Sequence, residues 1–242
     1  MSHDGRRRAI LAIDTATTQV VVASGSSDGE IDGLTTWAAG YRHGETLLPS
    51  IARFLGEQNL RRSRLAGIVV GTGPGAFTGL RVGIATAKGL AQGLGLPIAG
   101  ISTAEAFLAA ALAGEAAADA AGPAESGGVD GGGPVLLLPA GPNDRVVARH
   151  GQAPSLLPGG TDPDLGPGEW LVAVDLDGRA PADAVARGER ARRGLGQALV
   201  AMGAARLRGG GDDLAGLVPE YVTLPRGVSS GGGEVTWSRD RR

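Results

Sequence analysis

The stretch that decides the fold is GTGPGAFTGLRVG, residues 71–83. It follows a short apolar run, residues 65–70, that is typical of a buried strand, and it precedes an apolar, periodic stretch that is typical of a helix. A glycine-rich turn between a strand and a helix can leave amide N–H groups free to hold an anion. It can instead let two segments of backbone pack very closely. The first alternative favours an enzyme and the second a structural connection.

Composition limits the classes of function. The chain has 242 residues, of which 42% are hydrophobic, so it is long enough to build a real core. The absence of cysteine excludes disulfides, thiol catalysis and thiolate metal sites. A net charge of −2 gives no support for free-standing nucleic-acid binding. No apolar run approaches the roughly 20 residues of a membrane helix, and none near the start fits a signal peptide, so we expect a cytoplasmic protein without membrane contact.

The order of the predicted elements indicates an α/β protein. Helical spacing of Leu47, Leu48, Ile51, Phe54 and Leu55 predicts the first helix, and Ser102 with Glu105 matches a capping box that opens an alanine-rich helix. The full expected order is strands at 10–14, 19–24 and 31–37, a helix near 47–55, a strand at 65–70, a helix at 79–95, a strand at 97–101 and the alanine-rich helix. This is the order of a ribonuclease-H-like lobe, the building block of the actin-like (ASKHA) fold.

Changes in composition along the chain predict the domain organisation. Residues 1–112 are expected to form the first lobe, and the Ala, Gly, Pro and acidic residues of 113–134 predict a flexible low-complexity linker. Residues 135–226 are expected to form a second, smaller and degenerate lobe of the same kind. Its weaker signals are strands near 135–138, 145–149 and 170–174 and a helix at 195–207. The Gly/Ser-rich and then charged residues 227–242 predict a disordered tail.

Five residues are candidates for contact with an anion or a nucleotide. Asp14 ends the first strand, where an acidic residue could help to position a metal ion and a phosphate, or could hydrogen-bond its own turn. Gly73 and Gly75 lie in the glycine-rich turn, Thr78 could cap the helix that follows, and Arg81 is the nearby cation. The turn lacks the Gly-Lys-Ser/Thr ending of a P-loop and the Gly-x-Gly-x-x-Gly spacing of a dinucleotide site. A tight structural connection therefore stays open as the alternative.

The helix after the turn carries small residues four positions apart, at Gly79, Gly83, Ala87, Ala91 and Gly95. Glycine inside a helix costs about 0.8–1 kcal/mol relative to alanine, so packing must compensate for this composition. A stripe without large side chains permits a very short distance to a neighbouring element. That neighbour could be the chain's own sheet or a helix of another protein, and the pattern alone leaves both alternatives open.

No metal site is predicted. His43 precedes the first helix, but Leu47 stands where a second histidine would face the same ion. A serine-hydrolase elbow is absent from the segments that are expected to be ordered, and no pair of carboxylates stands out as an acid and base.

Four segments together resemble the bacterial TsaB (YeaZ-type) family. They are ILAIDTAT at 10–17, RHGETLLP at 42–49, GPGAFTGLRVG at 73–83 and LPIAGIST at 96–103, and PEYV at 219–222 resembles a short C-terminal element of that family. The resemblance covers about residues 9–110. One departure is clear: where the family usually has Asp-Ala-Arg-x-Gly-Glu-Val-Tyr, residues 138–147 read LPAGPNDRVV.

The resemblance implies a non-catalytic subunit of the machinery that makes threonylcarbamoyladenosine next to the anticodon of tRNA. It implies an actin-like fold shared with the catalytic paralogue TsaD, which binds metal through a His-x-x-x-His pair, and a complex that also contains the ATPase TsaE. The tRNA would be the substrate of the complex rather than a strong ligand of this chain, which would need no cofactor and could pair with itself when alone. Family members dock on TsaD through their first two helices, which gives these candidate interface residues: Leu48, Ile51, Leu55, Gly79, Gly83, Ala87 and Ala91.

Two enzymatic alternatives remain open at the level of sequence. One is an ATP-dependent small-molecule kinase of the actin-like class that uses Asp14 and the glycine-rich turn. The other is a metallopeptidase, against which the count of three histidines argues.

Overall fold

The computed structural model describes residues 8–38, 40, 43–121 and 132–222. Its first sheet has the order β3-β2-β1-β4-β5. The five strands are β1 (Ala9–Asp14), β2 (Gln19–Ser26), β3 (Ile31–Ala38), β4 (Leu65–Gly71) and β5 (Ile98–Ile101). The first three form an antiparallel meander, and β1, β4 and β5 run parallel. The carboxyl ends of β1 and β4 therefore meet at one edge of the sheet, which is where the glycine-rich turn begins.

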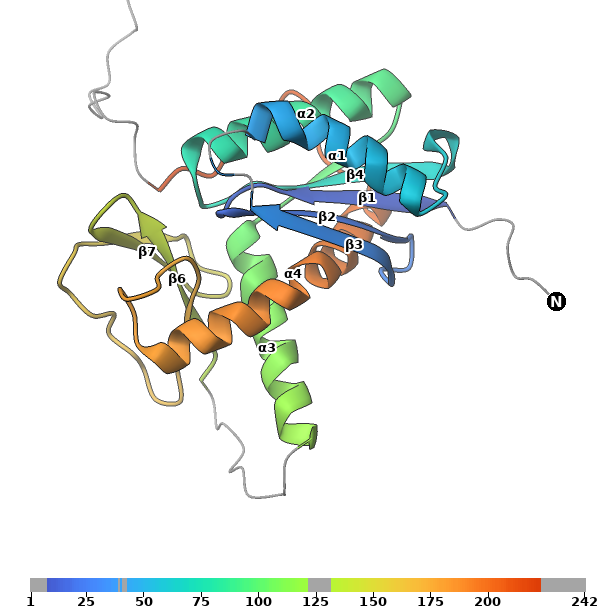
Figure 1. Ribbon diagram of the computed structural model, residues 1–242. Coiled ribbons are helices and arrows are strands. Elements are labelled where there is room, and N and C mark those ends of the chain that lie inside the picture. Colours follow the sequence, from blue (N-terminus) through green and yellow to red (C-terminus); the bar gives the residue numbers. More distant parts are fainter. Residues whose placement is uncertain (1–7, 39, 41–42, 122–131, 223–242) are drawn as a thin grey trace, which may run out of the picture.

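Helices cover both faces of this sheet, so its central strands are buried on both sides (Figure 1). Helices α1 (His43–Glu57) and α2 (Phe77–Leu94) cover one face, and α3 (Thr103–Ala121) and α4 (Ala182–Arg208) lie on the other. A short 3-10 turn, η1 (Arg62–Arg64), leads into β4. The predicted order of three strands, helix, strand, helix, strand and helix is confirmed for this part of the chain.

The second sheet is smaller and has the order β8-β7-β6-β9. Its strands are β6 (Pro134–Ala140), β7 (Asp144–Ala148), β8 (Ser155–Leu157) and β9 (Trp170–Ala173). Leu136, Leu138 and Val146 join the core formed with α3 and α4, while Val135 and Leu137 face a separate small core on the other side of this sheet. Helices α3 and α4 thus lie between the two sheets and join them into one packed unit.

The end of α3 and the start of α4 differ from the predicted boundaries, because both helices are longer than the sequence pattern indicates. Helix α3 continues to Ala121, so the first part of the expected linker 113–134 is helical, because alanine is the best helix former. Residues 122–131 and the expected tail 227–242 lie outside the described residues. Helix α4 begins at Ala182 rather than near residue 195. Its early turns are polar by composition yet bury Gly188 and Arg192, a burial that hydrophobic periodicity does not reveal.

The packing of α4 also changes the expected division into lobes. The sequence predicts that this helix belongs to a second lobe, 135–226. In the structure, α4 packs on β1, β2, β4 and β5 of the first sheet as well as on β9. Gly203 permits this, since a Cβ atom there would lie 2.3 Å from Cγ2 of Val69, and Gly188 allows equally close contact with the backbone of Ala173 in β9. The two sheets therefore share α4, which crosses from one to the other in Figure 1.

The predicted capping box does not form. The hydroxyl oxygen of Ser102 lies 3.2 Å from the carbonyl oxygen of Gly73 and 3.1 Å from Oε2 of Glu220, so its partners are these groups rather than the first turn of α3. The carboxylate of Glu105 instead contacts Nδ1 of His150 at 2.6 Å and accepts from the amide of Gly151 at 2.8 Å. These tertiary contacts, which a local motif cannot anticipate, attach the start of α3 to the second sheet.

Candidate functional site

The glycine-rich turn packs closely against the turn between β1 and β2. A Cβ atom on Gly75 would lie 2.1 Å from the carbonyl oxygen of Ala16, so only glycine fits there. That same oxygen accepts a hydrogen bond of 2.7 Å from the amide of Ala76. Of the two alternatives that the sequence left open, this close approach of two backbone segments is the one observed.

Gly73 is equally engaged by the chain itself. Its amide donates to Oγ1 of Thr103 at 3.1 Å, and its carbonyl accepts from the amide of Thr103 at 2.7 Å. With φ at +105°, Gly73 also has a backbone conformation that other residues rarely adopt. The amides of Gly73 and Ala76 are thus already used, which weakens the case for an anion held by this turn.

Asp14 is fully buried beneath the turn. Its Oδ1 accepts from the amide of Ala16 at 2.9 Å, and its Oδ2 accepts from the hydroxyl of Thr103 at 2.6 Å. Gly71 makes room for the carboxyl, because a Cβ atom there would lie 1.8 Å from Oδ2. Burial raises the pKa of Asp14 to about 6, although both hydrogen bonds oppose the shift. The geometry is that of a carboxyl that fastens its own turn, as the structural alternative predicted.

Thr78 and Arg81 do not have the surroundings expected of residues that bind an anion. Thr78 is an exposed residue within α2, and the residue that precedes the helix is Ala76, which offers no side-chain cap. Arg81 lies over the ring of Phe77, with Cζ 3.7 Å from the ring centroid, and its Nε donates to the hydroxyl of Tyr221 at 2.8 Å. The rings of Phe77 and Tyr221 are 5.0 Å apart. Arg81 thus belongs to a cation–aromatic cluster that fixes the segment 219–222 onto α2.

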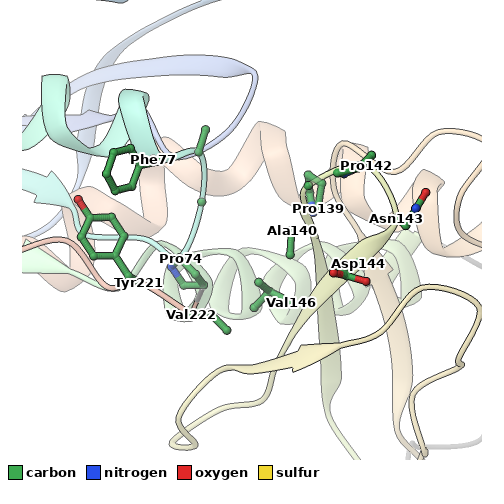
Figure 2. A pocket seen from close by; sticks show the side chains of 13 residues that line it. Pro74, Phe77, Pro139, Ala140, Pro142, Asn143, Asp144, Val146, Tyr221 and Val222 are labelled. Carbon is green, nitrogen blue, oxygen red and sulfur yellow. The ribbon is translucent and has the colours of Figure 1, made fainter. Parts of the chain in front are cut away.

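A cavity of about 660 Å³ lies between the glycine-rich turn and the β6–β7 hairpin (Figure 2). Phe77 and Tyr221 lie at one end of it, and Asn143 and Asp144 lie at the other. Oδ1 of Asp144 accepts a hydrogen bond of 3.0 Å from the amide of Gly159. The remaining lining is mostly apolar and consists of Pro74, Gly75, Ala76, Pro139, Ala140, Gly141, Pro142, Val146 and Val222. The diverged segment 138–147 therefore forms one wall of this cavity.

Sequence reasoning missed the ion pair that joins this region to α4. Asp175 accepts from the amide and the hydroxyl of Thr18, at 2.8 and 2.6 Å, and forms a salt bridge of 2.6 Å with Arg192. Arg192 also donates to the hydroxyl of Thr17. The pair joins residues 17 positions apart, so no local motif marks it; in the structure Asp175 has a φ of +58°, which aspartate tolerates better than most residues.

Six of the seven candidate interface residues lie in the chain's own core. Ile51, Leu55, Ala87 and Ala91 are buried, as are Gly79 and Gly83. The reason is that α2 lies directly on the sheet: a Cβ atom on Gly83 would lie 2.1 Å from Oγ1 of Thr15, and that hydroxyl donates to the carbonyl of Gly79. Four members of the stripe of small residues therefore pack in the chain's own core, whereas Gly95 follows the end of α2 with open space beside it.

Leu48 is the exception, because 53% of its surface is exposed. It borders a groove of about 720 Å³ between α1, η1 and α2, which is also lined by Ile51, Ala52, Leu55, Gly56, Leu60, Arg61, Arg62 and Leu90. The α2 residue that lines this groove is Leu90, and two further small residues of the same helix, Gly89 and Gly93, have open space beside them. A large partner side chain could approach the backbone here.

The sequence also predicts that the chain has no metal site and no membrane-spanning helix. Across residues 8–38, 43–121 and 132–222 no three His, Cys, Asp or Glu side chains come together as metal ligands. The side chain of His43 lies outside the described residues, so the prediction for it stays a prediction. Among the helices that the structure describes, none has the length and apolar character to cross a bilayer.

The fold and the site together define a mixed α/β protein with two sheets, which is consistent with the actin-like class. Two solved structures share this fold: YeaZ from Pseudomonas aeruginosa has a TM-score of 0.59 at 24% identity, covering 87% of this chain and 98% of that one. A protein described as similar to the peptidase YeaZ, also from Pseudomonas aeruginosa, has a TM-score of 0.60 at 23% identity, covering 89% of this chain and 99% of that one.

Sequence comparison finds relatives among proteins of tRNA threonylcarbamoyladenosine biosynthesis. Residues 32–133 match the family model described as TsaD, tRNA N6-adenosine threonylcarbamoyltransferase. The tRNA threonylcarbamoyladenosine biosynthesis protein TsaB of Escherichia coli is 38% identical over 94 residues, 39% of this chain and 40% of that protein. TsaB of Bacillus subtilis is 34% identical over 100 residues, 41% and 43% of the two chains. An uncharacterised protein of Mycobacterium leprae is 39% identical over 103 residues, 40% and 28%.

The resemblance to the TsaB (YeaZ-type) family that the motifs indicated is therefore confirmed. The matched segment spans less than half the length of these curated relatives, between 28% and 43% of each.

Proposed function

We propose that this chain is a non-catalytic subunit of the assembly that transfers a threonylcarbamoyl group to the adenosine next to the anticodon of tRNA. It acts in the cytoplasm by docking on a TsaD-like catalytic paralogue, in a complex that also includes a TsaE-like ATPase. The observation that carries the proposal is the similarity to TsaB proteins, together with a family-model match, residues 32–133, that includes all of α1 and α2.

The geometry of the turn supports a role without catalysis. A catalytic or metal-binding carboxylate must face its ligand, whereas Asp14 is fully buried and bonded to Ala16 and Thr103. A phosphate site needs unpaired amides, whereas those of Gly73 and Ala76 donate to Thr103 and Ala16. These contacts leave the kinase alternative without a site at the positions that it requires.

The outer face of α1 and α2 supports docking through these helices. Leu48 is exposed at the groove, and Gly89, the neighbour of the groove residue Leu90 in α2, has open space beside it, so a partner helix could bury Leu48 and approach α2 closely. The contact residues are then Leu48 and its exposed neighbours rather than the buried stripe. The same face could pair two copies of this chain when the partner is absent.

Reconstitution tests this proposal. The assay measures threonylcarbamoyl transfer to tRNA by the TsaD-like and TsaE-like proteins, supplied with the adenylate intermediate, with and without this chain. We expect activity to require this chain, to survive Asp14→Asn and to be lost in Leu48→Glu because a charge would be buried in the docking groove.

The matched control is Leu156→Glu, since Leu156 is 45% exposed on β8, in the second sheet. It should assemble and activate like the unmodified chain. Full transfer without this chain, or normal assembly by Leu48→Glu, contradicts the proposal. Loss of activity in an assembled Asp14→Asn complex would indicate a nucleotide-dependent function instead.

A further inference from the structure

Arginines from three separate segments gather at the edge of the first sheet where β1 and β4 begin. Arg8 directly precedes β1, and Arg61, Arg62 and Arg64 directly precede β4. The pairing of Ala9 with Leu65 brings these two chain entries side by side. Adjacent strands lie about 4.8 Å apart, so the two chain entries that carry these arginines are neighbours.

The end of α4 reaches the same edge. Leu207 lies against Gly67 near the start of β4, where a Cβ atom on the glycine would be 2.7 Å from Cδ1 of the leucine. Arg208 donates to the carbonyl of Ser27, next to the end of β2 that pairs with Ala9. In Figure 1 this edge, where β1 begins, is the one remote from β6 and β7. We call Arg8, Arg61, Arg62, Arg64, Arg206 and Arg208 the arginine edge.

The charge of this edge contrasts with the net charge of −2 of the chain. Arg8, Arg61 and Arg62 are exposed and have no carboxylate partner among the described residues. The carboxylates nearby are Asp28, Glu30 and Asp32 on the β2–β3 hairpin, Asp212 and Asp213, and Glu57 at the end of α1. Arg206 binds Asp212 at 2.6 Å, and Arg53 pairs with Glu57 at 3.8 Å. Positive charge therefore exceeds negative charge here, and it is concentrated on exposed guanidinium groups.

We propose that the arginine edge binds the phosphate backbone of the tRNA substrate when this chain is in its complex. The inference rests on the proposed function, since that function brings tRNA to the assembly. Guanidinium groups match phosphate oxygens in geometry and are weakly hydrated, which makes arginine well suited to this contact. The excess charge is small, so the edge contributes a few phosphate contacts and does not by itself make the free chain a tight RNA binder.

The character of the surface favours RNA over an acidic protein. Interfaces between proteins centre on buried aromatic and aliphatic anchors, whereas the arginine edge presents the exposed cations Arg8, Arg61 and Arg62. The exposed hydrophobic residue beside Arg61 and Arg62 is Leu48, which belongs to the proposed docking groove. Arg61 and Arg62 also border the groove next to Leu48. An RNA strand on the edge would therefore lie beside the proposed docking face, and it could continue onto the catalytic partner.

The test is the affinity of the assembled complex for an unmodified tRNA transcript, measured between about 50 and 300 mM salt. The Arg61→Gln, Arg62→Gln double variant should weaken binding about tenfold at low salt, and it should make the dependence of log K on log salt shallower by about 1.5, close to 0.7–0.9 for each lost phosphate contact. Arg193→Gln is the matched control, because Arg193 is exposed on α4 and has no carboxylate partner among the described residues.

The outcomes separate this inference from the proposed function. If the double variant assembles and the complex binds tRNA with unchanged affinity and salt dependence, the arginine edge is not an RNA surface, and the proposed function stands. If the variant fails to assemble with the paralogue, the arginines belong to the protein interface and the inference is wrong. If the unmodified chain neither assembles nor supports transfer, the proposed function itself fails.

Discussion

At the scale of single residues, Asp14 shows that the role of a carboxyl group depends on its surroundings. A carboxylate at the end of a first strand is a typical metal or phosphate ligand of actin-like kinases, and here it fastens the β1–β2 turn to Thr103. The environment favours the protonated form, since burial raises its pKa from 3.8 to about 6. Its titration therefore contributes to stability rather than to catalysis.

This shift predicts a pH dependence of the free energy of unfolding. The folded protein holds the proton more tightly than the unfolded chain, so the contribution is greatest below about pH 4 and is lost as the pH rises through 6. The variant Asp14→Asn carries an amide that does not titrate. Between pH 4 and 7 the unmodified chain should therefore lose roughly 2 kcal/mol relative to this variant.

Urea unfolding at several pH values measures this difference. Because other titrating groups are common to both proteins, they cancel in the comparison. A difference in unfolding free energy that stays constant from pH 4 to 7 would show that folding does not raise the pKa of Asp14.

At the scale of elements, α2 shows two kinds of glycine in one helix. Gly83 faces the sheet, and a Cβ atom there would lie 2.1 Å from Oγ1 of Thr15. Gly89 faces open space. The sequence shows both as the same cost in helix propensity, and only packing separates them.

The two substitutions to alanine should therefore change stability in opposite directions. Gly89→Ala should raise the free energy of unfolding by about 0.8–1 kcal/mol, because it adds helix propensity and meets nothing. Gly83→Ala gains the same propensity but must displace a buried, hydrogen-bonded threonine, so it should lower stability by about 1–3 kcal/mol. Denaturant unfolding of both variants checks the signs, and a gain in Gly83→Ala would mean that α2 does not lie on Thr15.

At the scale of the whole molecule, the pair Asp175–Arg192 connects three parts of the chain. Asp175 follows β9 of the second sheet, Arg192 lies on α4, and both bind the β1–β2 turn through Thr18 and Thr17. Both side chains are nearly buried, at 10% and 9% exposure. Removing Arg192 would leave the nearly buried carboxylate of Asp175 without its cation.

Arg192→Met should therefore lower the free energy of unfolding by about 3–5 kcal/mol. The double variant Arg192→Met, Asp175→Asn should recover part of that loss, because it removes the orphaned carboxylate and asparagine accepts the positive φ. Unfolding followed by circular dichroism gives the double-mutant cycle. Strictly additive losses would show that the two residues do not interact.

The sequence by itself determined the first half of the fold. Alternating and continuous apolar runs placed β1 to β5, and helical spacing placed α1 and α2, because local periodicity reflects burial on one or both faces. Its motifs also determined the resemblance to TsaB proteins.

Only the tertiary structure decided which side of α2 faces the sheet, where α4 begins and that it is shared between two sheets. It also decided that Asp14 and the amides of Gly73 and Ala76 are engaged internally. These features depend on contacts between residues far apart in the chain, such as Gly203 with Val69 and Asp14 with Thr103, and local pattern carries no information about such contacts.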